Sequence, residues 1–299
     1  MTAAVGLGAD ADARKARTVV LQAGEPASQA FVEVAAECVD HWRTNESLLT
    51  GSRAMPHLHQ TRVGIRRLRS AFSLFRPLLH DVAGARRVAH RLRDLARPFG
   101  AARDVDVLLS GPAMDTLGAR QAAALTAARE EAYDRVLAVL ASSEWAAASD
   151  AVDDLLARAP WDLPENPPVL DLAHHALERR WRRVVASHPV LVSMSSAERH
   201  RVRIEAKKLR YGCEFFASLH AVDTPHVVTG DGELLMGPAA YAWHVEQVQS
   251  ALGALNDHAA ADGLLRSVGS AAPPLDEPRL VDAGVDAVGR LAALDPFWR

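Results

Sequence analysis

The chain has 299 residues, of which 24% are charged, and its formal net charge is only −3. No run of about 18 apolar residues occurs, which argues against a membrane-spanning helix or a membrane partner. The two cysteines, Cys38 and Cys213, are too few for a disulfide framework and favour a reducing, cytoplasmic location. Aromatic residues are few while Ala, Leu and Arg abound, so the composition favours an all-α protein.

The N-terminal half is predicted to begin with a disordered tail and to continue as helices. Residues 1–26 are rich in Ala and Gly and lack the basic and apolar regions of a signal peptide. Apolar residues then recur at helical spacing. The predicted helices span residues 27–46, 57–79, 82–99 and 104–157, the last broken near Gly111 and Pro112. Gly100 is expected to stop the third helix and Asp104 to cap the next.

A proline-rich segment divides the chain, and helices resume after it. Four prolines lie between Arg158 and Pro168, which is typical of a linker. The second set of predicted helices spans residues 170–188, 196–219, 239–254, 257–268 and 276–294. Residues 221–238 are expected to form a long surface loop. The sequence therefore predicts one helical bundle over residues 27–160 and a second over 161–299.

The helix predicted at 57–79 carries a basic stripe. At 100° per residue, one arc of roughly a third of its circumference holds His59, Arg62, Arg66, Arg69 and Arg76. A solvated arginine face normally has Glu or Asp three or four residues away, because such pairs offset the repulsion between like charges. Arg62, Arg66 and Arg69 have no acid at either spacing, so a merely solvated face is disfavoured.

The same pattern occurs a second time in the C-terminal half. The motif His59, Arg62, Arg66, Arg67 and Arg69 is matched without a gap by His200, Arg203, Lys207, Lys208 and Arg210. Such a repeat predicts two packed bundles related by a pseudo-twofold axis. If the bundles face each other, the two stripes line one shared channel.

Further basic residues accompany the two stripes. Arg86, His90, Arg93 and Arg97 share a face of the third helix, and Arg179, Arg182 and Arg183 recur on the first helix after the linker. Residues 57–103 carry a net charge of +9 and residues 174–210 carry +7, which leaves −19 for the rest. Charge segregated in this way creates a strong local potential that attracts anions.

These residues resemble the CHAD family, the conserved histidine α-helical domain, over roughly residues 28–298. A second signature supports the resemblance: Leu92 to Leu108, through Gly100, has a counterpart from Val248 to Asp257, through Gly253. The resemblance implies an all-α fold of two antiparallel four-helix bundles around a basic central channel that binds inorganic polyphosphate. It also implies association with polyphosphate granules.

The candidate polyphosphate-binding residues combine the repeated motif with the neighbouring basic faces. They are His59, Arg62, Arg66, Arg67, Arg69, Arg76, Arg86, His90, Arg93, Arg97, Arg179, Arg182, Arg183, His200, Arg203, Lys207, Lys208 and Arg210. The second copy is weaker in its third helix, where Trp243, Glu246 and Ser250 stand at the positions of His90, Arg93 and Arg97.

Catalytic functions find little support in the sequence. No HExxH motif, phosphate-binding glycine loop or nucleophile elbow occurs, so neither an enzyme activity, a metal site nor a cofactor is expected. The triphosphate-tunnel enzyme domain that often accompanies CHAD domains has no counterpart here, and the chain is expected to be the binding module alone.

Other ligands and a purely structural role compete with polyphosphate as explanations of the stripes. Nucleic acid is disfavoured, because neither stripe interleaves aromatic residues for base stacking. The same basic residues would suit an inositol phosphate, and the sequence does not separate it from polyphosphate. A structural role in buried ion pairs is disfavoured, because the stripes contain too few acids to pair with their cations.

Overall fold

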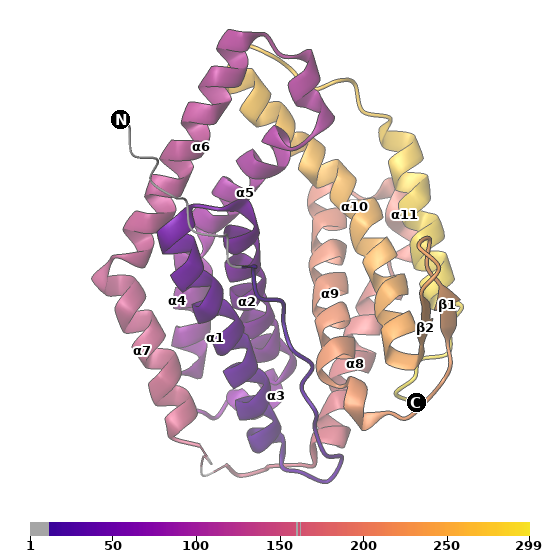
Figure 1. Ribbon diagram of the computed structural model, residues 1–299. Coiled ribbons are helices and arrows are strands. Elements are labelled where there is room, and N and C mark those ends of the chain that lie inside the picture. The colour runs from indigo at the N-terminus through magenta and orange to yellow at the C-terminus, as the bar shows by residue number, and fades with distance from the viewer. Residues whose placement is uncertain (1–11, 160, 162) are drawn as a thin grey trace.

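The computed structural model describes residues 12–159, 161 and 163–299, and it confirms the all-α class (Figure 1). The N-terminal half contains α1 (Ala27–Ser52), α2 (Met55–Leu74), α3 (Arg76–Leu79), α4 (Ala85–Leu95), α5 (Arg97–Leu109), η1 (Pro112–Thr116), α6 (Ala119–Leu140) and α7 (Ser143–Ala157). The C-terminal half contains α8 (Val169–Val185), η2 (His188–Ser193), α9 (Ser196–Phe215), η3 (Ala217–Leu219), β1 (His226–Val228), β2 (Leu234–Met236), α10 (Gly237–Ser267) and α11 (Glu277–Ala292). Within these residues, no helix has the length and apolar character needed to cross a membrane.

The two helices that carry the basic stripes, α2 and α9, begin at clear sequence signals. Pro56 lies in the first turn of α2, where its missing N–H group costs no hydrogen bond. The α9 helix begins with a capping box in which the backbone N–H of Ser195 donates to Glu198 over 2.8 Å. The Ser195 hydroxyl in turn accepts from the backbone N–H of Glu198. These signals fix where each stripe starts along its helix.

Each striped helix packs closely on its predecessor through a glycine. A Cβ atom added at Gly64 of α2 would lie 2.8 Å from the backbone of Trp42 in α1. A Cβ atom added at Gly212 of α9 would lie 2.9 Å from Leu177 in α8. Each distance is shorter than van der Waals contact allows. At Gly64 the neighbour is backbone, so a side chain there would push α1 and α2 apart, whereas at Gly212 the Leu177 side chain would have to move.

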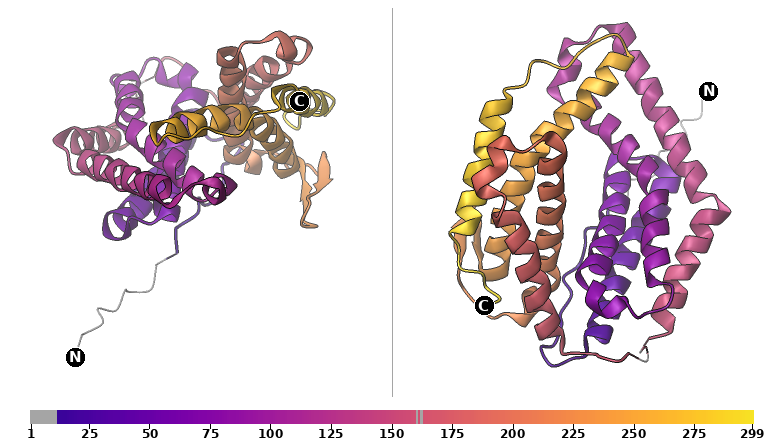
Figure 2. Two further views of the ribbon diagram at one scale, coloured as in Figure 1. Left: turned by 90° about the horizontal axis from the view of Figure 1, so that it is seen from above. Right: turned by 180° about the vertical axis from the view of Figure 1, so that it is seen from behind.

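The helices of the two halves lie on opposite sides, with α2 and α9 facing each other between them (Figures 1 and 2). Near α3 the halves share one continuous apolar core, in which the rings of Phe75 and Phe216 are 5.6 Å apart. At the other end a smaller apolar cluster joins Leu108 of α5 and Leu125 of α6 to Leu265 of α10. Apolar contacts therefore join the halves at both ends, and the charged stretches of α2 and α9 lie between. The pseudo-twofold relation between the halves stays a prediction.

Several predicted boundaries differ from the structure. Gly100 does not stop a helix: α5 begins at Arg97, with Pro98 in its first turn, and runs through Gly100 and Asp104 to Leu109. Asp104 is consequently not an N-cap. The helices predicted at 239–254 and 257–268 form one uninterrupted helix, α10. In both places a glycine inside a helix, Gly100 in α5 and Gly253 in α10, stands where a helix break is predicted.

Two segments predicted to lack structure are partly ordered. Within the predicted tail, Val19 and Leu21 are buried, and the Leu21 N–H donates to Ser218 over 2.8 Å. Apolar side chains with a place in the core explain this order, which the Ala- and Gly-rich composition obscures. The predicted loop at 221–238 contains an antiparallel hairpin in which His226 of β1 pairs with Met236 of β2. Residues 1–11 of the predicted tail lie outside the described residues.

Candidate functional site

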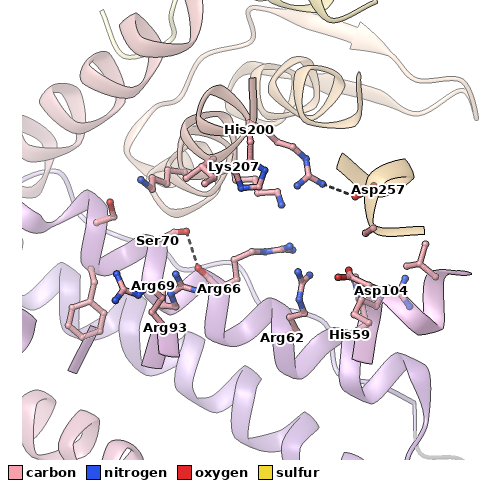
Figure 3. A pocket seen from close by; sticks show the side chains of 18 of the residues that line it. His59, Arg62, Arg66, Arg69, Ser70, Arg93, Asp104, His200, Lys207 and Asp257 are labelled. Atoms are coloured by element: carbon pink, nitrogen blue, oxygen red, sulfur yellow. Dashed lines mark hydrogen bonds and ion pairs between the residues drawn. The ribbon is translucent and has the colours of Figure 1, made fainter. Parts of the chain in front are cut away.

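A cavity of about 1760 Å³ lies between the two striped helices (Figure 3). Its Arg and Lys lining residues come from α2, α3, α4, α5 and α9. Among its lining residues are ten Arg or Lys side chains, namely Arg62, Arg66, Arg69, Arg76, Arg86, Arg93, Arg103, Arg203, Lys207 and Lys208. The lining also includes five histidines and only two carboxylates, Asp104 and Asp257. The structure therefore brings both predicted stripes to one site.

Two glycines inside helices lie beside arginines of the lining. A Cβ atom at Gly253 of α10 would lie 3.2 Å from the guanidinium of Arg203, which is tighter than ordinary contact. Gly100 of α5 similarly lies beside Arg62, at 3.9 Å from a built Cβ to Nε. These two glycines occupy matching positions in the second sequence signature. Neither glycine ends a helix: at Gly253 the missing side chain leaves room for Arg203, whereas a Cβ atom at Gly100 would make only ordinary contact with Arg62.

The arginines of α2 repel one another across the site. Burial, and then the charge of Arg66, lower the pKa of Arg62. Burial, and then the charge of Arg93, lower the pKa of Arg69. Among the described residues, neither Arg62 nor Arg69 forms an ion pair with an acid. The unliganded cavity therefore holds positive charge that the protein does not neutralise.

Arg66 is held across the interface between the two striped helices. Its Nε donates a hydrogen bond of 2.7 Å to the hydroxyl of Tyr211 in α9. The guanidinium also lies 5.7 Å from the centre of the Tyr211 ring, within the range of a cation–π interaction. Tyr211 thus positions this arginine, while no acid neutralises it in the part of the chain that the structure describes.

The two adjacent lysines of α9 have different surroundings. Lys208 forms an ion pair of 2.7 Å with Glu205. Lys207 has no such partner in the described part of the chain, and it reaches into the cavity opposite Arg62 and Arg66 (Figure 3). Burial, together with the charges of Arg203, Arg66 and Arg62, lowers the pKa of Lys207 to about 7. Near neutral pH this amine is therefore only partly protonated.

His59 and His200 both line the cavity, as the repeated motif predicts. Burial and the charge of Arg103 lower the pKa of His59 to about 4. In the unliganded protein His59 is therefore neutral at pH 7. A neutral imidazole still offers one N–H donor to an anion.

The two carboxylates in the lining compensate only a fraction of this charge. Asp257 of α10 lies 3.6 Å from Arg203, and the dashed line in Figure 3 marks this pair. Burial raises the pKa of Asp104, and the charge of Asp257 raises it further while that of Arg62 lowers it. Both carboxylates sit at the end of the cavity near His59. The other ionisable side chains among the lining residues are Arg, Lys and His.

Arg67 and Arg210, although predicted as ligand contacts, do not line the cavity. Arg67 of α2 is buried, forms an ion pair with Glu214 of α9, and stacks over the Phe215 ring at 4.8 Å. Arg210 reaches the same Glu214 over 2.8 Å. The two residues form a structural link between the striped helices. Arg67 lies off the arc of the stripe, which accounts for its different direction.

The remaining predicted residues outside the cavity lie mostly beside acids. Arg97 pairs with Asp94 over 3.0 Å. Arg182 lies 2.7 Å from Glu178, and Arg183 lies 3.3 Å from Glu205. Arg179 likewise does not line the cavity. The basic face of α8 therefore does not line the cavity, although Arg183 shares Glu205 with the lining residue Lys208.

Part of the lining is not singled out by the sequence. Arg103 of α5 and the Asp257–His258 pair of α10 are missed, because the predicted helix breaks lie beside them. One end of the cavity is also apolar, with Val107 and Leu108 of α5 facing Ala261 and Leu265 of α10. If the helix is continued through Gly100 instead of being ended there, Arg103 belongs to the same helix as Arg97.

Comparison with known proteins places this geometry in context. A family model described as the CHAD domain matches residues 33–266. The crystal structure of the CHAD domain from the plant Ricinus communis is similar, with a TM-score of 0.69 and 24% identity over 94% of this chain and 90% of that one. PptA from Streptomyces chartreusis is similar with a TM-score of 0.58 and 19% identity, over 90% of this chain and 93% of that one. These two likenesses concern the fold, and no curated protein matches the sequence.

Proposed function

Because this chain belongs to the CHAD family, we propose that its basic cavity binds inorganic polyphosphate and that the protein acts as a binder without enzymatic activity. The observation that supports this proposal is the convergence of two stripes on one cavity. Arg62, Arg66 and Arg69 of α2 face Arg203 and Lys207 of α9, and the lining contains only two carboxylates.

The spacing of these cations suits a chain of phosphates. Side chains one helical turn apart repeat at about 5–6 Å, which is a workable pitch for successive phosphate groups. Arginine grips two phosphate oxygens with its planar fork and stays protonated at neutral pH. Polyphosphate lying along α2 would therefore meet one guanidinium after another, with no requirement for base recognition.

The electrostatics of the unliganded site favour a polyanion over a single small anion. Burial and mutual repulsion lower the pKa values of Arg62, Arg69 and Lys207. A bound chain of negative charges relieves this repulsion at each of these positions at once. A single phosphate would neutralise only its immediate neighbours.

The nature of the lining supports binding more than hydrolysis. Asp104 and Asp257 are the carboxylates present, and Asp257 is engaged with Arg203. Among the described residues, no group of three or more His, Cys, Asp or Glu is placed to hold a metal ion. Incubation of the protein with polyphosphate should therefore release no orthophosphate above the rate of a protein-free control.

The lining is poorly suited to nucleic acid. Single-strand binders place aromatic side chains where bases can stack on them. Apart from histidines, Phe72 is the aromatic residue in the described lining, and it is 7% exposed because it packs in the core. The cavity offers phosphate contacts without a stacking platform.

A titration with defined ligands tests the proposed function. Polyphosphates of several fixed chain lengths, single-stranded DNA of equal charge and inositol hexakisphosphate are compared in the same buffer by calorimetry. We expect affinity to rise with polyphosphate length until the cavity is filled, and to exceed that for DNA. Equal affinity for DNA and polyphosphate would contradict the proposal, and so would preference for the inositol phosphate. Association with polyphosphate granules in cells belongs to the same proposal.

A further inference from the structure

Lys207 is an amine, and so a potential nucleophile, that lies among arginines suited to bind phosphate. It reaches into the cavity from α9, opposite Arg62 and Arg66 of α2 and beside Arg203 of its own helix (Figure 3). The charged groups that act on it from α2 and α9 are thus positive, and Asp257 of α10 is the nearby acid that opposes them. The arrangement resembles the general case in which a neighbouring cation activates a lysine.

The chain contains its own comparison for this amine. Its three lysines are Lys15, Lys207 and Lys208. Lys15 is exposed in the extended N-terminal segment, and Lys208 lines the same cavity but is paired with Glu205 at 2.7 Å. Only Lys207 has both a place in the cavity and no carboxylate partner among the described residues. The three lysines therefore differ in two properties: whether they line the cavity and whether they pair with a carboxylate.

We propose that Lys207 is a modification site that reacts with small acyl phosphates. The arginines around the amine bind the phosphate group of the reagent and place the adjacent carbonyl carbon within its reach. The amine attacks that carbon, the bond from the carbonyl carbon to the phosphate oxygen breaks, and an amide forms. Inorganic phosphate leaves and takes up the proton that the amine loses, so the reaction needs no further reactant.

The protonation state of Lys207 agrees with this reactivity. Its pKa of about 7 leaves a large fraction of the amine neutral at pH 7.5. An ordinary lysine with a pKa of about 10.4 has roughly 0.1% of its amine neutral at that pH. The lower basicity of Lys207 costs part of this advantage, and we expect its acylation to be about tenfold faster than that of an exposed lysine.

Acylation would also change the cavity. An amide carries no charge, so the modified site loses one cation at its centre. This consequence rests on the proposed function, because it predicts weaker polyphosphate binding after modification. The acylation itself needs only a small anion site and is independent of polyphosphate binding.

The test uses the full chain with acetyl phosphate at pH 7.5. Digestion with a protease that cleaves at Glu, followed by fragment-ion mass spectrometry, resolves acetylation at Lys207 from that at Lys208. We expect acetylation at Lys207 to be about tenfold faster than at Lys15 or Lys208, and inorganic pyrophosphate to suppress it at Lys207 alone. Equal rates at the three lysines, or fastest reaction at Lys15, would overturn the proposal.

A second donor separates phosphate recognition from simple amine reactivity. Acetylimidazole carries the same acyl group without a phosphate, so its preference for Lys207 over Lys15 should be smaller than that of acetyl phosphate. An equal preference would show that the arginines do not recognise the phosphate, and would overturn the proposal. The polyphosphate titration is a separate measurement. If Lys207 is acetylated selectively but the protein does not bind polyphosphate, only the proposed function is refuted.

Discussion

At the scale of single residues, we expect Lys207 to couple the proposed polyphosphate binding to pH. Its pKa is about 7 in the unliganded protein, and a bound polyanion raises it because negative charge favours the ammonium form. Below pH 7 the amine is protonated with or without ligand, and affinity is highest. As pH rises from 7 towards 9, binding must take up a proton, so affinity for polyphosphate should fall by at most about tenfold per pH unit. Calorimetry in buffers of different ionisation enthalpy measures the proton uptake.

The Lys207→Arg variant is the control for this pH dependence. Arginine keeps its charge throughout this range, so the variant should bind with a flatter pH profile above pH 7. The terminal phosphate groups of polyphosphate titrate in the same way with both proteins, so their effect cancels in the comparison. Identical profiles for the two proteins would show that Lys207 does not titrate on binding.

The same pKa also predicts the pH dependence of stability in the absence of ligand. The folded-state pKa of Lys207 lies below that of an unfolded lysine, so the unfolded chain binds more protons between about pH 7 and pH 10. The contribution of Lys207 to the free energy of unfolding therefore increases with pH over this window. Urea melts of the parent protein and of Lys207→Met should converge in stability as pH rises from 7 to 9.

The arginines of α2 predict opposite effects on affinity and stability. The Arg62→Ala/Arg69→Ala variant removes two unneutralised cations and leaves Arg66 bonded to Tyr211. Stability without ligand should hold or rise, because repulsion falls by a few tenths of a kcal/mol per pair and Ala favours helix. Polyphosphate affinity should fall by roughly a hundredfold or more, since a hydrogen bond to a charged group contributes about 1.5–3 kcal/mol.

A matched control for this variant is Arg87→Ala/Arg91→Ala. These residues of α4 are exposed and do not line the cavity, but their replacement removes the same net charge. Thermal melts and polyphosphate titrations of the two variants separate the local contacts from the overall charge. A lower melting temperature for Arg62→Ala/Arg69→Ala, or equal loss of affinity in both variants, would contradict the site assignment.

At the scale of helices, the link between α2 and α9 is structural. Arg67 has a side chain that is only 7% exposed, and it shares Glu214 with Arg210. Arg67→Ala should lower the free energy of unfolding by about 3 kcal/mol, the lower end for breaking a buried pair, because Arg210 still partners Glu214. The folded fraction should keep its affinity for polyphosphate. Chemical denaturation measures the first effect, and titration at low temperature measures the second; a large loss of affinity would place Arg67 in the binding site.

The repeated motif predicts two of the helices that line the cavity, α2 and α9. The absence of acids at i±3 and i±4 singles out the stripe of α2, the motif repeat adds α9, and the cavity contains most of the residues in these stripes. The sequence does not show that Arg67 has an acidic partner and Arg66 has none among the described residues, because the position of Glu214 beside Arg67 depends on how α2 and α9 pack. Glu178 could be expected beside Arg182 because it stands four residues before it, whereas Glu205 belongs to α9 and reaches Arg183 only through helix packing.

The predicted helix breaks are misplaced for a physical reason. A glycine inside a helix is unfavourable by about 1 kcal/mol, so Gly100 and Gly253 suggest helix ends. In the structure both glycines lie inside uninterrupted helices, and at Gly253 the missing side chain leaves room for Arg203 of α9, so tertiary packing there outweighs the local preference. Arg103 and Asp257 lie just beyond these glycines, and the site residues of α5 and α10 are missed with them.

At the scale of the whole molecule, charge segregation determines how the ligand arrives and how salt affects it. The chain has a net charge of only −3, yet its cavity lining contains ten Arg or Lys side chains. A polyanion is drawn to this region by the local potential, while acidic surfaces elsewhere repel it. The overall isoelectric point is therefore a poor guide to the ligand.

The salt dependence of binding follows from the same charge distribution. Each phosphate that an arginine neutralises releases condensed counterions, so the logarithm of affinity falls linearly with the logarithm of salt concentration. By analogy with nucleic acid, six to ten contacts should lower polyphosphate affinity by roughly three to five decades between 50 and 200 mM salt. The Arg62→Ala/Arg69→Ala variant should give a slope shallower by about two contacts, whereas Arg87→Ala/Arg91→Ala should leave the slope unchanged. An affinity that does not change over this range would mean that a few specific contacts, and not the two stripes together, hold the ligand.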